Sequence, residues 1–164
     1  MKLKAWISTA IAAVCSALLP ACDIANIQAI KPGITTASEV RTLMGPPSAE
    51  FRNSDGSITL EYTRQPQGVH CYMITIGNNQ LVQDLEQVLT DRNFAQAREG
   101  MSQAEISRLF GTPASKVIFD NLREEVWEWR VEGVPSTEET YFNVHFDIEN
   151  GLLKKAGKRV QPRA

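Results

Sequence analysis

Histidine and cysteine are scarce in this chain of 164 residues, which contains 2 histidines and 3 cysteines. A transition-metal site needs several His, Cys or carboxylate ligands at short, characteristic spacings. Neither His70 nor His145 stands in such a pattern. The sequence therefore predicts no metal site and no cofactor other than a covalent lipid.

Motifs of catalysis are also missing. The chain has no nucleophile elbow and no glycine-rich loop of the kind that holds phosphate. Its most conspicuous carboxylates, Glu39 and Glu105, are better explained as helix caps than as an acid and base pair. We expect a protein that is not an enzyme, although a site assembled from distant residues remains an alternative.

An excess of positive charge is absent as well. The formal net charge is −2, which gives no reason to expect a nucleic acid as partner. A basic cluster near the C-terminus favours a solvated strand and tail over contact with anionic lipid headgroups; it consists of Lys154, Lys155, Lys158, Arg159 and Arg163.

No hydrophobic run is long enough to span a bilayer comfortably. Lys2 and Lys4 precede a short apolar run over residues 5–19, as in a secretory signal. The run ends in Leu19-Pro20-Ala21-Cys22, which resembles a bacterial lipobox. This resemblance implies that residues 1–21 are removed and that Cys22 is lipidated; the alternative is a plain signal cut near Ala21.

Cysteine usage agrees with lipidation. Cys15 lies in the signal, so a lipidated Cys22 leaves Cys71 alone. A lone thiol cannot form an internal disulfide. Cys71 stands in a strand-like run, where a free cysteine behaves as a small buried hydrophobic residue.

The chain contains an internal repeat. Residues 26–47 return in recognisable form as residues 93–113, with a glycine, a short helix and a Gly-x-Pro ending in both copies. A period of this length indicates two supersecondary units that share a sheet or core. We predict one module over residues 22–89 and a second over residues 90–164.

Each copy is predicted to begin with a short helix of about two turns. Asp23 and Thr90 are the expected N-caps of these helices. Gly33 and Gly100 are expected to end them, because glycine readily adopts the left-handed conformation.

A second helix follows in each copy. Thr36-x-x-Glu39 and Ser102-x-x-Glu105 have the pattern of capping boxes. Apolar stripes follow with i, i+3, i+4 spacing, and Gly45 and Gly111 are expected to stop the helices.

Strands come next, since the apolar period changes to 2 at residues 58–63 and 127–131. Further strands are expected at 48–51, 72–76, 114–119 and 141–148, with tight turns at Asn78-Asn79 and Asn150-Gly151. Residues 81–89 also fit a helix, but the repeat favours a strand. The predicted class is α+β: a tandem repeat of helix-turn-helix and an antiparallel meander of three or four strands, with helices on one sheet face.

The signal, the lipobox, the motif over residues 100–113 and the strand Val126-Trp-Glu-Trp129 together resemble the SmpA/OmlA lipoprotein family, to which BamE belongs. The resemblance implies an envelope lipoprotein that supports outer-membrane protein assembly by binding partners. That assembly subunit has one module and this chain has two. Tandem copies are instead similar to the architecture of the β-lactamase inhibitor protein.

A partner surface is predicted on the strand at residues 141–148. Phe142, Val144, Phe146 and Ile148 form an apolar face that should lie under the helices. The opposite face carries Tyr141, Asn143, His145 and Asp147, side chains that suit either protein recognition or ordinary solvation. Trp127 and Trp129 are expected in the core, with a binding role as the alternative.

The first helix begins near the lipid-bearing cysteine, so we expect the domain to lie against a membrane surface. We expect the protein at the periplasmic face of the outer membrane. The inner membrane is the alternative location, because Asp23 follows the cysteine. The first functional hypothesis is a scaffold or accessory subunit of the β-barrel assembly machinery type. The second is a binder or inhibitor of a periplasmic enzyme.

Overall fold

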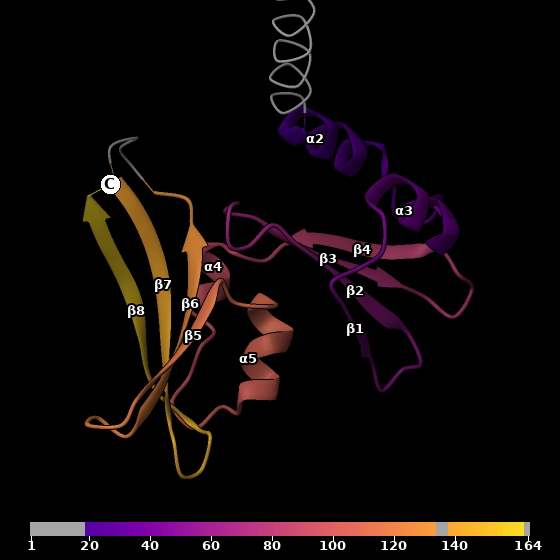
Figure 1. The fold of residues 1–164 in the computed structure, drawn as a ribbon. Helices are drawn as coiled ribbons and strands as arrows, with labels where there is room; N and C mark the ends of the chain where they lie inside the picture. Colours follow the sequence, from indigo (N-terminus) through magenta and orange to yellow (C-terminus); the bar gives the residue numbers. More distant parts are fainter. Residues whose placement is uncertain (1–18, 134–137, 163–164) are drawn as a thin grey trace, which may run out of the picture.

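The structure is a computed structural model that describes residues 19–133 and 138–162. The predicted signal peptide lies almost entirely outside the described residues. Figure 1 shows two sheets with helices beside them, and the described part of the chain has four helices, α2 (Leu19–Ala29), α3 (Ala37–Met44), α4 (Asp91–Phe94) and α5 (Gln103–Phe110). This arrangement confirms the α+β class.

Both sheets are antiparallel and four-stranded, with the strands in sequence order. The first sheet contains β1 (Ala49–Arg52), β2 (Ile58–Thr63), β3 (Cys71–Ile76) and β4 (Val82–Gln87). The second contains β5 (Ser115–Phe119), β6 (Glu124–Val131), β7 (Glu138–Asp147) and β8 (Leu153–Pro162). Residues 81–89 therefore form a strand and not a helix, as the comparison of the two copies favoured.

The caps of α3 and α5 confirm the sequence pattern. Thr36 and Ser102 each make a reciprocal capping box with the glutamate three residues later. Gly45 and Gly111 end the two helices with positive φ angles of 80° and 73°. These contacts form within a few residues of chain, so the local sequence is sufficient to specify them.

The first helices of the two halves differ from the prediction. Asp23 is not an N-cap, because it lies inside α2, where its carboxylate is 2.6 Å from Nε of Arg64. Thr90 does cap α4, but that helix has only 4 residues and ends well before Gly100. Gly33 and Gly100 have positive φ in the turns that follow, and neither directly closes a helix.

The turn between β3 and β4 also differs in detail. Its positive φ angle, 63°, falls on Gln80 and not on the predicted Asn78-Asn79, whereas Gly151 of the predicted Asn150-Gly151 turn has a positive φ of 68°. Each turn is followed by an isolated bridge, Thr36 with Leu81 and Ser102 with Leu152. The bridges tie the N-terminus of each second helix to the end of its own hairpin.

One hydrophobic core lies between α2, α3 and the first sheet. Val40 of α3 meets Leu60 and Tyr62 of β2 and Ile74 of β3, all of them fully or almost fully buried. The hydroxyl of Tyr62 donates a hydrogen bond to the carbonyl of Gly45 at 3.2 Å. This core covers one face of the first sheet.

A second core lies between α4, α5 and both sheets. Ile106 and Phe110 of α5 pack in one cluster with Trp129 of β6 and with Cys71 and Met73 of β3. Because residues alternate between the two faces of a strand, Cys71 and Met73 lie on the face opposite to Ile74. The first sheet is thus covered on both faces, while the described helices cover only one face of the second.

Buried positions of the second sheet follow the prediction with one exception. Trp127 and Trp129 are buried, as expected for core residues, and so is Cys71 of the first sheet. Phe142, Val144 and Phe146 are also buried, but Ile148 is 41% exposed. Ile148 follows the end of β7 and is exposed, so its assignment to the apolar face under the helices was wrong.

None of the helices in the described part of the chain has the length and apolar character needed to cross a membrane.

Candidate functional site

The candidate site is the open face of the second sheet, opposite α4 and α5. The structure brings Tyr141, Asn143 and His145 together on this face of β7, where all three are half-buried. Their neighbours on β6 are Arg130, Glu128 and Val126, in that order. The sequence-predicted residues are therefore contiguous, and their role as partner contacts remains a prediction.

A groove of about 380 Å³ runs across this face. It combines apolar and polar side chains from all four strands and the β5–β6 turn: Ser115, Val117, Phe119, Leu122, Val126, Glu128, Asn143, His145 and Arg159. Val117, Phe119 and Leu122 are exposed. Grooves with an apolar wall and a few fixed polar groups are typical of binding sites.

Asn143 lies on the floor of the groove. Its backbone pairs with Glu128 on one side and with Gly157 on the other. Since glycine has no side chain, nothing on β8 stands above the Asn143 amide in this row. Its Oδ1 atom is buried and has no hydrogen-bond partner among the described residues, which is an uncommon state for a buried polar atom.

Tyr141 is held in place by its neighbours. Its hydroxyl donates to Glu139 at 2.6 Å, and this hydrogen bond raises the pKa of the phenol above its ordinary value. Glu139 also pairs with Arg130 at 2.8 Å. The guanidinium of Arg159 lies 5.0 Å from the centre of the Tyr141 ring and pairs with Glu128 at 2.8 Å. The polar side of the groove is therefore preorganised.

His145 belongs to a cluster around a buried carboxylate. Nδ1 of His145 is 2.8 Å from Glu124, and Lys154 and Lys155 lie 3.0 and 3.6 Å from the same carboxylate. The hydrogen bond from His145, followed by that from Lys154, lowers the pKa of Glu124 to about 2. Lys154 and Lys155 of the basic cluster near the C-terminus thus have a carboxylate partner, as do Lys158, which pairs with Asp91, and Arg159.

We expect Glu124→Gln to lower the free energy of unfolding at pH 7 by about 2 kcal/mol, because three cationic or polar partners lose a charged acceptor. The folded-state pKa of Glu124 lies below its ordinary value of 4.5. Its contribution is therefore complete above about pH 4.5 and is lost as the pH falls through about 2. Urea denaturation between pH 2 and pH 7 measures the difference in the free energy of unfolding between wild type and the variant.

Glu99→Gln is the matched control, since Glu99 is exposed, and we expect it to change the stability little. A Glu124→Gln effect of the same size at every pH would contradict the assignment.

Sequence reasoning missed the apolar wall of the groove. Val117 and Phe119 alternate in β5, and Leu122 follows in the turn. Their period of 2 was a usable signal, but which of the two faces is left uncovered depends on the packing of α5.

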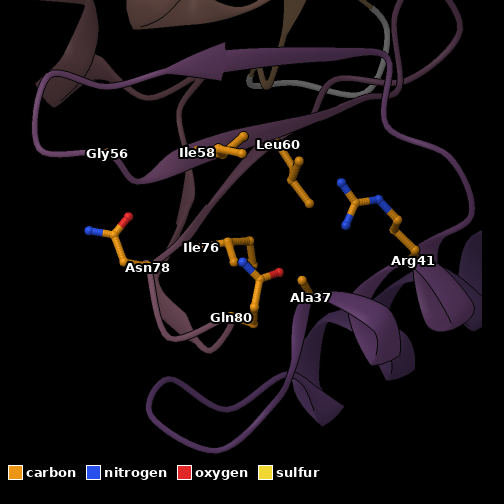
Figure 2. Close-up of a pocket in the computed structure, with 9 residues that line it drawn as sticks. Ala37, Arg41, Gly56, Ile58, Leu60, Ile76, Asn78 and Gln80 are labelled. Atoms are coloured by element: carbon orange, nitrogen blue, oxygen red, sulfur yellow. The ribbon is translucent and has the colours of Figure 1, made fainter.

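A second pocket lies between α3 and the first sheet, lined among others by Ala37, Arg41 and Ile76 (Figure 2). Its volume of about 110 Å³ is below the range of ordinary ligand sites. Arg41 at its rim is already paired with Glu50 at 2.9 Å. We therefore do not assign a function to it.

Residues 19–133 and 138–162 contain no group of three or more His, Cys, Asp or Glu side chains placed to hold a metal ion. The sulfur of Cys71 is fully buried, and burial raises the pKa of its thiol well above the ordinary value. A thiol in this state is a poor nucleophile.

No protein-family model matches the chain, and no curated protein matches it. The SmpA/OmlA resemblance is thus without support from these comparisons. Two solved structures are similar in part. A Streptococcus mutans protein described as a candidate β-lactamase inhibitor protein matches with 13% identity and a TM-score of 0.34, over 84% of this chain and 95% of that one. A DUF4309 family protein (YjgB) from Bacillus subtilis matches with 11% identity and a TM-score of 0.32, over 83% and 84%. Scores this low carry no argument about function.

Proposed function

We propose that this chain is a non-enzymatic, lipid-anchored protein of the cell envelope that binds a protein partner through the open face of its second sheet. The observation that carries the proposal is the groove on that face. It joins exposed apolar side chains to polar groups fixed by ion pairs, and it contains the unpartnered Oδ1 of Asn143. Surfaces with rigid aromatic and polar anchors suit the recognition of a folded protein.

The membrane anchor is supported by the sequence around Cys22 and by its surroundings. The backbone of Cys22 lies in α2, directly before Asp23. Asp23 is paired with Arg64, the residue that follows β2 of the first sheet. The chain therefore has little free length between the lipid and the folded domain. Ile24, two residues after Cys22 in α2, is exposed, as expected for a surface that lies against lipid. The outer membrane remains the favoured location, with the inner membrane as the alternative.

Two classes of partner remain. The first is a subunit of the machinery for outer-membrane protein assembly, for which this chain would be a scaffold, as the resemblance of its caps and glycines to the SmpA/OmlA family implies. The groove favours the second class, an enzyme or other folded periplasmic protein that a tandem-module binder would grip, because a preformed site loses little entropy on binding.

Photo-crosslinking in cells tests the proposal. A photoreactive side chain at position 143 should capture one defined protein, and the same group at exposed Gln83 of β4 should not. Barrel-assembly subunits would support the scaffold, and a single soluble enzyme the binder. Equal or absent capture at both positions would refute the open face as the contact. In the same cells, a fatty-acid label that persists in Cys22→Ala would refute the anchor.

A further inference from the structure

Strand β5 is a free and exposed edge of the second sheet. It pairs with β6 on one side, and no strand among the described residues lies on its other side. All five of its residues are exposed. Such an edge presents unpaired backbone N–H and C=O groups, which are a template for another strand.

The two edges of this sheet are built differently. The opposite edge, β8, carries Lys154, Lys155, Lys158 and Arg159. Charged side chains on an edge strand discourage pairing with other chains. Strand β5 has a single charged residue, Lys116, and its last three residues are the apolar Val117-Ile118-Phe119. The β5 edge is therefore less protected than the β8 edge and is suited to receive a strand.

We propose that β5 pairs antiparallel with β5 of a second copy of this chain, with the two-fold axis at Ile118. In this register Ile118 lies opposite itself and Val117 lies opposite Phe119 of the other copy. Lys116 then lies opposite Asp120 of the other copy, the first residue after β5, and the pair occurs twice by symmetry. Opposite charges directly across two strands stabilise the pairing.

Both charged residues are available for this contact. Neither Lys116 nor Asp120 takes part in an ion pair within the described part of the chain. The ammonium of Lys116 lies 3.7 Å from the centre of the Trp127 ring of β6, so its contact within the chain is with a ring and not with a carboxylate. Four residues of extended chain span about 13 Å, so Lys116 and Asp120 of one copy are too far apart to pair. A second copy supplies an ion-pair partner for each.

The pairing has a consequence for the open face. The two second sheets would join into one continuous sheet of eight strands, and Val117 and Phe119 of both copies would lie along the junction. Each groove would then adjoin the other, so one dimer could present two partner sites side by side. A bivalent surface binds a clustered or symmetric partner more tightly than a single site does.

Disulfide trapping tests the register. Directly opposite residues in an antiparallel pair have Cα atoms about 4.5–5.5 Å apart, within the range of a disulfide. The full chain carrying Ile118→Cys should therefore form a majority of disulfide-linked dimer under mild oxidation. Val160→Cys is the matched control, because Val160 is 54% exposed on the other edge strand and Ile118 is 58% exposed. The dimer yield of Val160→Cys should not exceed that of wild type. The wild-type yield measures disulfides formed by the native cysteines alone.

Charge exchange tests the same register independently. In the Ile118→Cys background, Lys116→Asp or Asp120→Lys alone should reduce the dimer yield at least fivefold, because each places like charges opposite one another. Together they should restore it. Equal trapping at positions 118 and 160, or trapping at 118 that charge reversal leaves unchanged, would overturn the proposal. Capture at position 143 does not depend on β5 pairing, so either proposal can fail alone.

Discussion

Replacing Gly111 by alanine is expected to lower the free energy of unfolding by about 4 kcal/mol, roughly twice the effect of the same change at Gly45. The two glycines occupy equivalent places at the ends of α5 and α3. Their φ and ψ angles are 73° and −164° at Gly111 and 80° and −164° at Gly45. Residues other than glycine rarely adopt this conformation, so each substitution costs about 2 kcal/mol of backbone strain.

The difference comes from what lies beside each glycine. A Cβ atom at Gly45 would meet nothing within 4 Å. At Gly111 it would lie 2.6 Å from Sγ of Cys71 and 3.0 Å from Cδ of Glu61, both on the first sheet. Cys71 and Glu61 are buried, so neither side chain can move aside freely. Overpacking of this kind typically costs a further 1–3 kcal/mol.

Equilibrium urea denaturation of the two single variants and wild type measures the effect. Cys71→Ala provides the control, because it removes the sulfur that the new methyl group would meet. In that background the extra cost of Gly111→Ala over Gly45→Ala should become smaller, because only the close approach to Glu61 remains. Equal costs for the two glycines in the native background would show that α5 does not pack against the first sheet as described.

Replacing Asn143 by arginine is expected to weaken partner binding by about thirtyfold or more while the protein stays folded. Asn143 lies on the groove floor opposite Gly157, so a long side chain there would occupy the space that a partner needs. It would also add a positive charge beside Arg159, which lines the same groove. Loss of a central contact in an interface commonly costs 2 kcal/mol or more.

Gln83→Arg is the matched control, because it makes the same change from amide to guanidinium at an exposed position of β4. Binding of the partner captured by crosslinking is measured by titration calorimetry for both variants and wild type. Thermal denaturation of each variant checks the fold. Equal affinities of the two variants would rule out the open face as the binding surface.

The sequence predicted much of the local structure, because caps and strand alternation depend on residues close together in the chain. The capping boxes at Thr36 and Ser102 and the helix ends at Gly45 and Gly111 depend on contacts within about four residues. The pattern of residues 141–146 gave the buried face of β7 correctly, since strand alternation is also local. It was wrong where a residue left the strand, as Ile148 does.

Other errors arose where a distant contact prevailed over a local preference. Asp23 looked like an N-cap, but it pairs with Arg64, which lies 41 positions away in the sequence. The helix predicted after Thr90 is shortened to a single turn, and Phe94 at its end packs against Phe142 and Phe110. The apolar wall of the groove was overlooked because its exposure depends on which face α5 covers.

By itself the sequence determined the strands and the second helix of each half with its caps, because those features depend on neighbouring residues. Only the tertiary structure decided that α5 lies between the two sheets. That placement buries Glu61 and Cys71 against Gly111 and covers both faces of the first sheet. The second sheet alone keeps an open face, and with it the groove around Asn143. The two halves of the chain have the same capping boxes, yet only the second sheet has a face without covering helices. Burial of a sheet face depends on contacts between residues far apart in the sequence.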